Sequence, residues 1–242
     1  MSDLPRFFYN SALTENSTVS LDEATAKHIW QVLRMQPGDR LLLTDGKGTI
    51  AKGVISSAER HQCSVSLEKV TTNPRKGSLL YLGVCFTKNN SRNEWLLEKA
   101  TELDVGAIIP ILSKRSEKTY FRHERWQKIL TSAILQSQQN YLPQLSDIMK
   151  LNDILTGYKN IPQKLIAHCF DDESKGSLSK LLIPYTDTIL LIGPEGDFTT
   201  EEVNLCVENG FKTVSLGAQR LRTETAALTV SAYFNVINDE GN

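Results

Sequence analysis

Short runs of β-branched residues and leucine alternate with turn signals over the first 72 residues, a pattern typical of a small β-rich unit. Two strands are expected on either side of the turn Asp45-Gly46-Lys47-Gly48, and the alternating segment 62–70 predicts a third. The stretch from Asp22 to Arg34 predicts one helix, which ends before the turn Pro37-Gly38-Asp39. These residues are therefore expected to form a small barrel with one helix.

Beyond residue 72 the pattern changes to unbroken apolar runs separated by helical segments. Residues 71–78 are polar with Pro and Gly, which favours a linker. The strands are expected at residues 79–86, 106–112, 164–170, 188–193 and 212–217, and the helices at residues 91–103, 123–140, 177–183, 200–210 and 223–238. This alternation predicts an α/β fold with a mostly parallel sheet covered on both faces. We expect two domains, residues 1–72 and 73–242.

The composition excludes several classes of protein. With 40% apolar and 23% charged residues, the 242-residue chain is neither disordered, collagen-like nor a coiled coil. Its longest apolar runs are far shorter than the roughly 18 residues of a membrane span, and the N-terminus shows no export signal, so a cytoplasmic protein without a membrane partner is expected. The four cysteines and four histidines are scattered without paired spacing, so no metal site is expected.

The charges are balanced overall but unevenly distributed. The formal net charge is −1, yet residues 113–128 hold six basic and two acidic side chains, and residues 171–210 hold nine acids and two lysines. The basic segment also contains Tyr120, Phe121 and Trp126. Such a pattern suits a protein that contacts nucleic acid with one face, although an ordinary solvated surface is the alternative that charge alone leaves open.

In a parallel sheet, ligands bind beyond the carboxyl ends of the strands, which directs attention to three loops. These loops span residues 168–170, 193–196 and 217–222. The loop at Gly193 enters a helix at Thr199, and Glu202 three residues later has the spacing of a capping box. Glycines allow the backbone to approach a ligand closely. A plain strand-to-helix turn is the alternative for this loop.

Two of these loops carry a resemblance to a known family. The segments LLIGPEGDFTTEEV (190–203) and VSLGAQRLRTETAAL (214–228) closely resemble the cofactor loops of the RsmE family, the rRNA uridine-N3 methyltransferases of the SPOUT superfamily. Residues 28–48 resemble that family's N-terminal PUA-like barrel, and residues 87–118 resemble its first helix and second strand. The resemblance covers essentially the whole chain.

The resemblance implies a trefoil-knotted α/β domain after a PUA-like RNA-binding barrel, a homodimer, and S-adenosylmethionine bound in the knot. The implied reaction is methylation of N3 of a uridine in the 16S rRNA of the small ribosomal subunit. The turns around positions 193 and 217 are expected to meet and hold the methyl donor. The residues expected to bind the cofactor are His168, Cys169, Ile192, Gly193, Pro194, Gly196, Leu216, Gly217, Leu221 and Arg222.

The chemistry of N3 suggests two catalytic residues. N3 of uracil must lose its proton, and the charge spreads onto O2 and O4, where Arg222 is expected to stabilise it. Glu224 is the candidate acceptor of the proton. The alternatives are an ion pair of Arg222 with Glu224 or Glu195, and a role for Glu224 in the first turn of its helix.

Contacts with RNA are expected from scattered cations, each of which has an ordinary surface role as its alternative. These residues are Arg6, His28, Arg34, Lys88, Arg92, Lys114, Arg115 and Lys118. Trp95 and Trp126 are expected in the core rather than as platforms for bases.

The chain departs from the family pattern at two places. Asp104 stands where members have glycine at a helix end, and Gln139 and Asn140 occupy a stretch in which many members carry an arginine. Two other functions stay open: a related SPOUT methyltransferase acting on tRNA or on a ribose 2′-hydroxyl, and a non-catalytic RNA-binding ribosome-assembly factor. The N-terminal barrel argues against the first, and the intact loops argue against the second.

Overall fold

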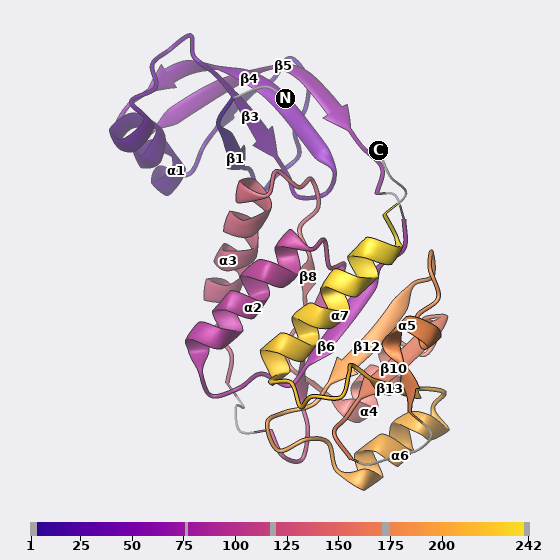
Figure 1. Ribbon diagram of the computed structural model, residues 1–242. Helices are drawn as coiled ribbons and strands as arrows, with labels where there is room; N and C mark the ends of the chain where they lie inside the picture. Colours follow the sequence, from indigo (N-terminus) through magenta and orange to yellow (C-terminus); the bar gives the residue numbers. More distant parts are fainter. Residues whose placement is uncertain (1–3, 76, 117–119, 171–174, 240–242) are drawn as a thin grey trace. The chain divides into compact units, whose positions relative to one another are not determined.

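The computed structural model describes residues 4–75, 77–116, 120–170 and 175–239 (Figure 1). The chain divides into two compact units. The first consists of Met1–Arg75 together with Ile134–Leu142, and the second of Lys76–Ala133 together with Pro143–Asn242. The sequence gives no local sign that residues 134–142 group with the first unit.

The first unit is built on a five-stranded sheet with the order β1-β3-β4-β5-β2. Its strands are β1 (Arg6–Phe8), β2 (Thr18–Ser20), β3 (Arg40–Thr44), β4 (Thr49–Ala58) and β5 (Cys63–Thr72). The three longer strands and the turn between β3 and β4 confirm the prediction. Asp45 shapes that turn, because its Oδ1 accepts hydrogen bonds from the backbone N–H groups of Lys47 and Thr49 at 2.7 and 3.0 Å.

The predicted helix of the first unit consists of two parts. α1 (Glu23–Lys27) begins at the N-cap Asp22, whose side chain accepts from the Thr25 backbone N–H, and it continues as the π-helix η1 (His28–Leu33). The helix ends because Arg34 has a left-handed conformation with φ 52°. Ala26 and Ile29 face the core of this unit.

The segment 134–142 is joined to the first unit by several hydrogen bonds. Arg6 donates to the backbone oxygen of Gln138 at 2.6 Å and to Oδ1 of Asn140 at 2.7 Å. The backbone N–H of Leu142 donates to Gly46 O at 2.8 Å. Asn140, at the place of the family arginine, is thus an acceptor for an arginine of β1.

The second unit contains an eight-stranded sheet whose pairings are all parallel, which confirms the α/β prediction. The order is β11-β13-β10-β12-β6-β7-β8, and β9 also pairs with β7. The strands are β6 (Leu80–Val84), β7 (Ala107–Leu112), β8 (Gln144–Leu145), β9 (Met149–Lys150), β10 (Gln163–Ala167), β11 (Gly176–Ser177), β12 (Thr188–Ile192) and β13 (Lys212–Ser215).

Helices cover both faces of this sheet (Figure 1). They are α2 (Asn90–Glu102), α3 (His123–Gln136), α4 (Leu151–Gly157), α5 (Leu178–Leu181), α6 (Thr200–Glu208) and α7 (Thr223–Ile237). Ile189 and Leu191 of β12 share a core cluster with residues of α4 and α6. Side chains alternate along a strand, so Leu190 faces the other side, where α7 packs beside α2. None of the helices in the described ranges is long and apolar enough to cross a membrane.

The structure tests three local predictions: where α3 ends, the backbone conformation of Asp104, and the burial of two tryptophans. α3 ends at Gln136 rather than Asn140, because Gln138 has a left-handed conformation with φ 58°. Asp104 has φ 54°, so this aspartate takes the conformation expected of the family glycine. Trp126 is 2% exposed, as predicted, whereas Trp95 is 46% exposed and its placement in the core was wrong. Trp95 lies on a helix whose buried stripe is formed by Asn93, Leu96, Leu97, Ala100 and Thr101.

Candidate active site

A cavity of about 500 Å³ lies at the carboxyl ends of three adjacent strands, β13, β10 and β12. Its walls come from the loops that follow these strands and from the first turn of α7. This is the place at which ligands bind in open parallel sheets. The volume falls within the range of roughly 300 to 1,000 Å³ that is common for small-molecule sites.

The loop after β12 is rigidly shaped by its own residues. The predicted capping box is present: Thr199 Oγ1 accepts from the Glu202 N–H, and Glu202 Oε2 accepts from the Thr199 N–H. Asp197 is buried and has φ 64°. Its Oδ1 accepts from the Phe198 N–H at 2.9 Å, and its Oδ2 accepts from the Cys169 N–H at 2.8 Å. Asp197 therefore ties the loop after β12 to the loop after β10.

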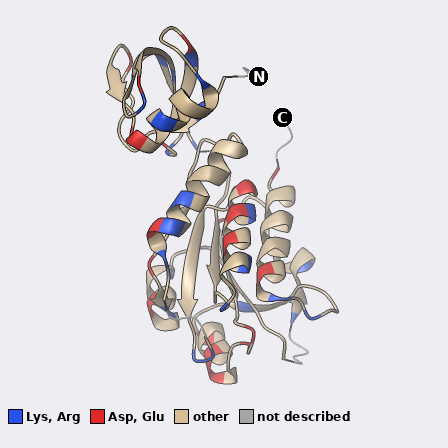
Figure 2. Ribbon diagram, turned by 90° about the vertical axis from the view of Figure 1, so that its left-hand side faces the viewer, with Lys and Arg blue, Asp and Glu red and all other residues tan. Residues whose placement is uncertain are grey.

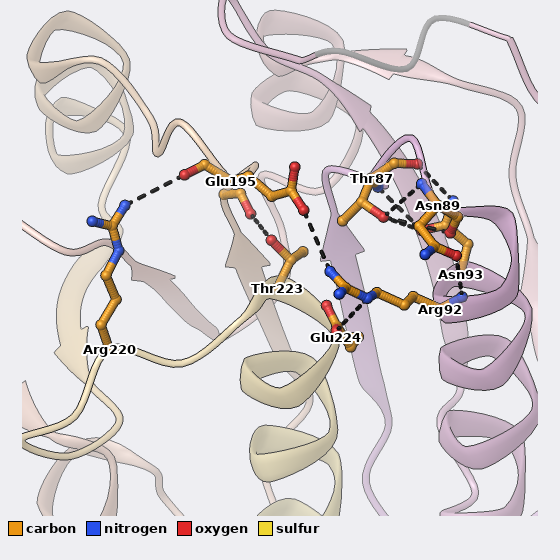
Figure 3. Close-up of polar contacts among 9 residues, drawn as sticks. Thr87, Asn89, Arg92, Asn93, Glu195, Arg220, Thr223 and Glu224 are labelled. Carbon is orange, nitrogen blue, oxygen red and sulfur yellow. Dashed lines mark hydrogen bonds and ion pairs between the residues drawn. The ribbon is translucent and has the colours of Figure 1, made fainter.

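The segment after β13 closes the cavity. Gly217 has φ 131°, a conformation that residues with a Cβ rarely adopt. Thr223, at the start of α7, donates from Oγ1 to Gly193 O at 3.1 Å, and Arg220 donates to Glu195 O at 3.4 Å (Figure 3). The expectation that the turns around positions 193 and 217 come together is confirmed.

The loop after β10 supplies the third wall. His168 is buried, and its ring lies 5.3 Å from that of Phe170, centroid to centroid. Lys175 donates to the backbone oxygens of His168 and Phe170. Cys169 is exposed in this loop, whereas Cys85 and Cys206 are buried. Burial raises the pKa of the Cys85 and Cys206 thiols to about 12. Those two thiols stay protonated at neutral pH and are poor nucleophiles.

Most of the residues expected to bind the cofactor lie on this cavity. They are His168, Cys169, Ile192, Gly193, Pro194, Leu216, Gly217 and Leu221. Gly196 and Arg222 are not part of its lining. The sequence did not point to Asp197, Lys175 or Thr223, which also line it. Asp197 directly follows Gly196 in the loop after β12. This position is the sequence signal that could have identified it as a site residue.

The two candidate catalytic residues have different surroundings. Arg222 is the N-cap of α7; it is exposed, and its side chain makes no capping hydrogen bond. Glu224 follows in the first turn and has a side chain that is 9% exposed. Among the described residues, Glu224 Oε2 is buried and has no hydrogen-bond partner. The carboxylates considered as partners for Arg222 pair instead with Arg92.

Arg92 extends between the carboxylates of Glu195 and Glu224 (Figure 3). Its Nη1 lies 3.7 Å from Glu195 Oε1, and its Nε lies 3.5 Å from Glu224 Oε1. The start of α2 is held in place, because Asn89 Oδ1 accepts from the Arg92 N–H at 3.2 Å. Arg92 thus connects α2 with the loop after β12 and the start of α7.

A network behind Arg92 fixes the turn from β6 into α2. Asn93 Nδ2 donates to Thr87 O at 2.8 Å, and Asn93 Oδ1 accepts from the Thr87 N–H at 3.1 Å (Figure 3). Both residues are buried. The network orders the turn that presents Arg92. The sequence predicted a helix here, but not this pairing of an asparagine with the preceding loop.

Comparison with known proteins identifies the family. A family model described as the RNA methyltransferase domain matches residues 75–235, well over half of the chain. The chain belongs to this RNA methyltransferase family. A second model, the RNA methyltransferase PUA domain, matches residues 21–68. The fold is accordingly an α/β RNA methyltransferase domain preceded by a PUA domain, as predicted.

Relatives cover nearly the entire chain. Ribosomal RNA small subunit methyltransferase E of Bacillus subtilis (strain 168) is 30% identical over 230 residues, with 89% of each chain covered. The structure of a ribosomal RNA small subunit methyltransferase E from Neisseria gonorrhoeae bound to S-adenosyl methionine has a TM-score of 0.84 and 29% identity, over 97% of this chain and 98% of that one. A probable rRNA-methyltransferase from Porphyromonas gingivalis gives a TM-score of 0.87 and 34% identity, over 97% and 98%.

The cations expected to bind RNA are spread over both units of this RNA methyltransferase. In the first unit, His28 and Arg34 are exposed, while Arg6 is half-buried and holds Gln138 and Asn140. In the second unit, Lys88 is exposed and Arg92 is part of the carboxylate cluster.

The basic segment is partly neutralised by the fold. Lys114 Nζ lies 3.7 Å from Glu201 Oε2, and Arg115 donates to Gly196 O at 2.9 Å. Figure 2 shows Lys and Arg beside Asp and Glu on helices of the second unit. Lys118 lies outside the described residues. One cation of the basic segment, Lys114, is thus paired with an acid from the segment that follows β12.

Proposed function

We propose that this protein methylates N3 of a uridine in 16S rRNA, using S-adenosylmethionine as the methyl donor. The observation that carries the proposal is the meeting of the Gly193 and Gly217 turns on one cavity at the carboxyl ends of the parallel strands. The Neisseria gonorrhoeae relative bound to S-adenosyl methionine supports the choice of donor. The Bacillus subtilis relative, named for the small-subunit ribosomal RNA, supports the choice of RNA.

The residues around the cavity fit a nucleoside with a charged methionine side chain. Ile192, Leu216 and Ala226 provide apolar wall, while the loop backbones provide N–H and C=O groups. Asp197, whose carboxylate accepts from two backbone N–H groups, holds the loops after β10 and β12 together at a fixed spacing. S-adenosylmethionine supplies an electrophilic methyl group when it is bound there.

The residues of this chain then prepare the nucleophile. Glu224 accepts the N3 proton, and Arg222 at the entrance of α7 stabilises the charge that spreads onto the uracil oxygens. Positioning contributes the most to such a transfer, because N3 must lie close to the methyl group and in line with the bond that breaks. Thr223 lines the cavity for the methyl donor, and Glu224 is the next residue. The first turn of α7 therefore connects the donor cavity with the proposed proton acceptor.

The remaining assignments belong to the same proposal. We assign RNA binding to a PUA-like domain of residues 1–72 and methyl transfer to a domain of residues 73–242, although residues 73–75 and 134–142 group with the first unit. After β13, the chain passes the ends of β10 and β12 before α7 packs on β6 and β12, which is consistent with the implied trefoil knot. We propose further that the enzyme acts in the cytoplasm as a homodimer and without a metal ion.

Nucleoside analysis tests the proposed function. In cells lacking this protein, we expect 16S rRNA to lose N3-methyluridine at one position, and the purified protein to restore it in the presence of S-adenosylmethionine. Mass spectrometry of the digested RNA identifies the methylated atom. Methylation of a ribose 2′-hydroxyl or of tRNA would contradict the proposal in favour of a related methyltransferase. Binding of rRNA without any methylation would contradict it in favour of an assembly factor.

Binding to rRNA should depend on salt. Exposed cations such as Arg34, Lys88 and Lys128 release counterions from the phosphates, so log K is expected to fall linearly with log salt concentration. The slope should be modest, because Lys114 and Arg115 are engaged within the protein. Fluorescence anisotropy with a labelled 16S fragment from low to moderate salt measures it. An affinity that does not change with salt contradicts the prediction.

A further inference from the structure

We propose that Arg92 is a catalytic residue that hydrogen-bonds to a uracil carbonyl oxygen while Glu224 accepts the neighbouring N3 proton. The inference rests on the proposed methylation of uridine N3. The sequence placed Arg92 only among the contacts with RNA. The structure places its guanidinium beside the buried carboxylate of α7, 3.5 Å from Nε to Glu224 Oε1.

The first observation is the buried acceptor on Glu224. Its side chain is 9% exposed, and within the described part of the chain its Oε2 is buried without a hydrogen-bond partner. A buried carboxylate oxygen without a donor is costly, and its presence in a fold calls for an explanation such as a ligand or a catalytic role. The missing partner must bring an N–H or O–H group. In a uridine the pairing edge of the base offers one N–H group, at N3.

The second observation is the spare donor capacity of Arg92. Its contacts of 3.5 and 3.7 Å are longer than the roughly 2.7–2.9 Å of a strong charged hydrogen bond. A guanidinium carries several N–H groups in one plane, and neither carboxylate binds this one tightly. The side chain is 34% exposed, so a flipped base can reach it.

The two side chains together match uracil and not cytosine. Glu224 presents an acceptor and Arg92 a donor, side by side (Figure 3). Uracil offers the complementary order, with a donor at N3 and acceptors at O4 and O2. Cytosine has an acceptor at N3 and an amino donor at C4, so it would place like groups against like. The pair is therefore a specificity device as well as a catalytic one.

The chemistry balances with these groups alone. The N3–H bond breaks and the proton passes to the Glu224 carboxylate. The freed electron pair of N3 forms the bond to the methyl carbon, and the electrons of the broken carbon–sulfur bond remain on sulfur. While negative charge is present on the ring, Arg92 stabilises it at one oxygen and Arg222 at the other. Arg92 acts on the charged ring before methyl transfer is complete. Its loss should therefore lower the rate of methyl transfer and leave the affinity for S-adenosylmethionine unchanged.

The test uses the full chain, S-adenosylmethionine and a 16S rRNA fragment. Arg92→Ala is expected to lower the single-turnover rate about 50-fold, somewhat less than removal of a donor dedicated to the transition state, while calorimetry shows nearly unchanged donor affinity. The loss should shrink as pH rises, because hydroxide then helps to remove the N3 proton. It should also shrink with 5-fluorouridine at the target, whose N3–H is more acidic. Lys99→Ala, which removes a cation from the same helix outside this cluster, should keep wild-type activity.

A purely structural role for Arg92 gives a different pattern. In that case donor affinity falls with the rate, and neither alkaline pH nor 5-fluorouridine restores activity, which overturns the inference. Arg92→Lys keeps the charge but has fewer donors, and we expect it to recover part of the rate. If the wild-type protein forms no N3-methyluridine, the proposed function fails and this inference with it. If the wild type is active and the Arg92→Ala defect is not rescued, this inference alone fails.

Discussion

Arg222→Ala is expected to slow methyl transfer about 1,000-fold, at the upper end of what the loss of one transition-state donor costs. Arg222 is exposed at the N-cap of α7, and among the described residues no carboxylate pairs with it. All of its N–H groups can therefore serve the substrate, whereas Arg92 offers only the donor capacity that its two long contacts with carboxylates leave spare. The loss should accordingly exceed that of Arg92→Ala.

The affinity for S-adenosylmethionine should fall much less in the same variant. Arg222 does not line the cavity, so the donor keeps its walls when the side chain is removed. Single-turnover rates with rRNA and calorimetry with the donor measure the two effects separately. Lys212→Ala is the matched control. It removes an exposed cation from the first residue of β13, the strand that precedes the loop leading to Arg222. An equal loss of rate and donor affinity would remove Arg222 from the proposed chemistry.

The two arginines illustrate what a sequence predicts about a site. The loops were identified from glycines and from their resemblance to a family, and most of the residues named on that basis line one cavity. The pairing of charges was not predictable. Arg222 and Glu224 are two positions apart, and side chains at that spacing do not face each other on a helix. The partner of Glu224 is instead Arg92, on a different helix and far away along the chain.

The fold was predictable where burial leaves a strong local signal. Apolar runs predicted β6, β7, β10 and β12, because both faces of these strands are covered. The strands β8, β9 and β11 have two residues each, too few to show a hydrophobic pattern. They are strands because they pair with a neighbouring strand of the sheet. The helix α4 was missed, since its seven residues follow a short strand without a clear boundary.

Long-range hydrogen bonds account for the rest. Residues 134–142 group with the first unit because Arg6 and Gly46 bind their backbone, and no local pattern records such partners. The uneven charge of the sequence had a similar outcome. Lys114 of the basic segment pairs with Glu201 from the segment after β12, and Arg125 pairs with Glu94 of α2. A cluster of like charges in a sequence therefore indicates a binding surface only after its partners in the fold are known.

Asp197→Ala should weaken S-adenosylmethionine binding about 100-fold, because the carboxylate accepts two backbone N–H groups and its loss costs roughly 3 kcal/mol. One of these groups belongs to Phe198, which is fully buried, so its N–H group would lose its acceptor away from the protein surface. The other belongs to Cys169, so the loop after β10 loses its link to the loop after β12. The cavity walls then no longer hold their spacing, and the melting temperature should fall as well.

Asp197→Asn is the matched control, since asparagine also tolerates the left-handed conformation at φ 64° and keeps one acceptor oxygen. It should bind the donor with an affinity between those of the wild type and Asp197→Ala. The amide nitrogen would face one of the two N–H groups, so full recovery is not expected. Calorimetry and thermal unfolding, each with and without S-adenosylmethionine, measure both effects. Wild-type donor affinity in Asp197→Ala would contradict this prediction. It would show that the loops keep their spacing without this carboxylate.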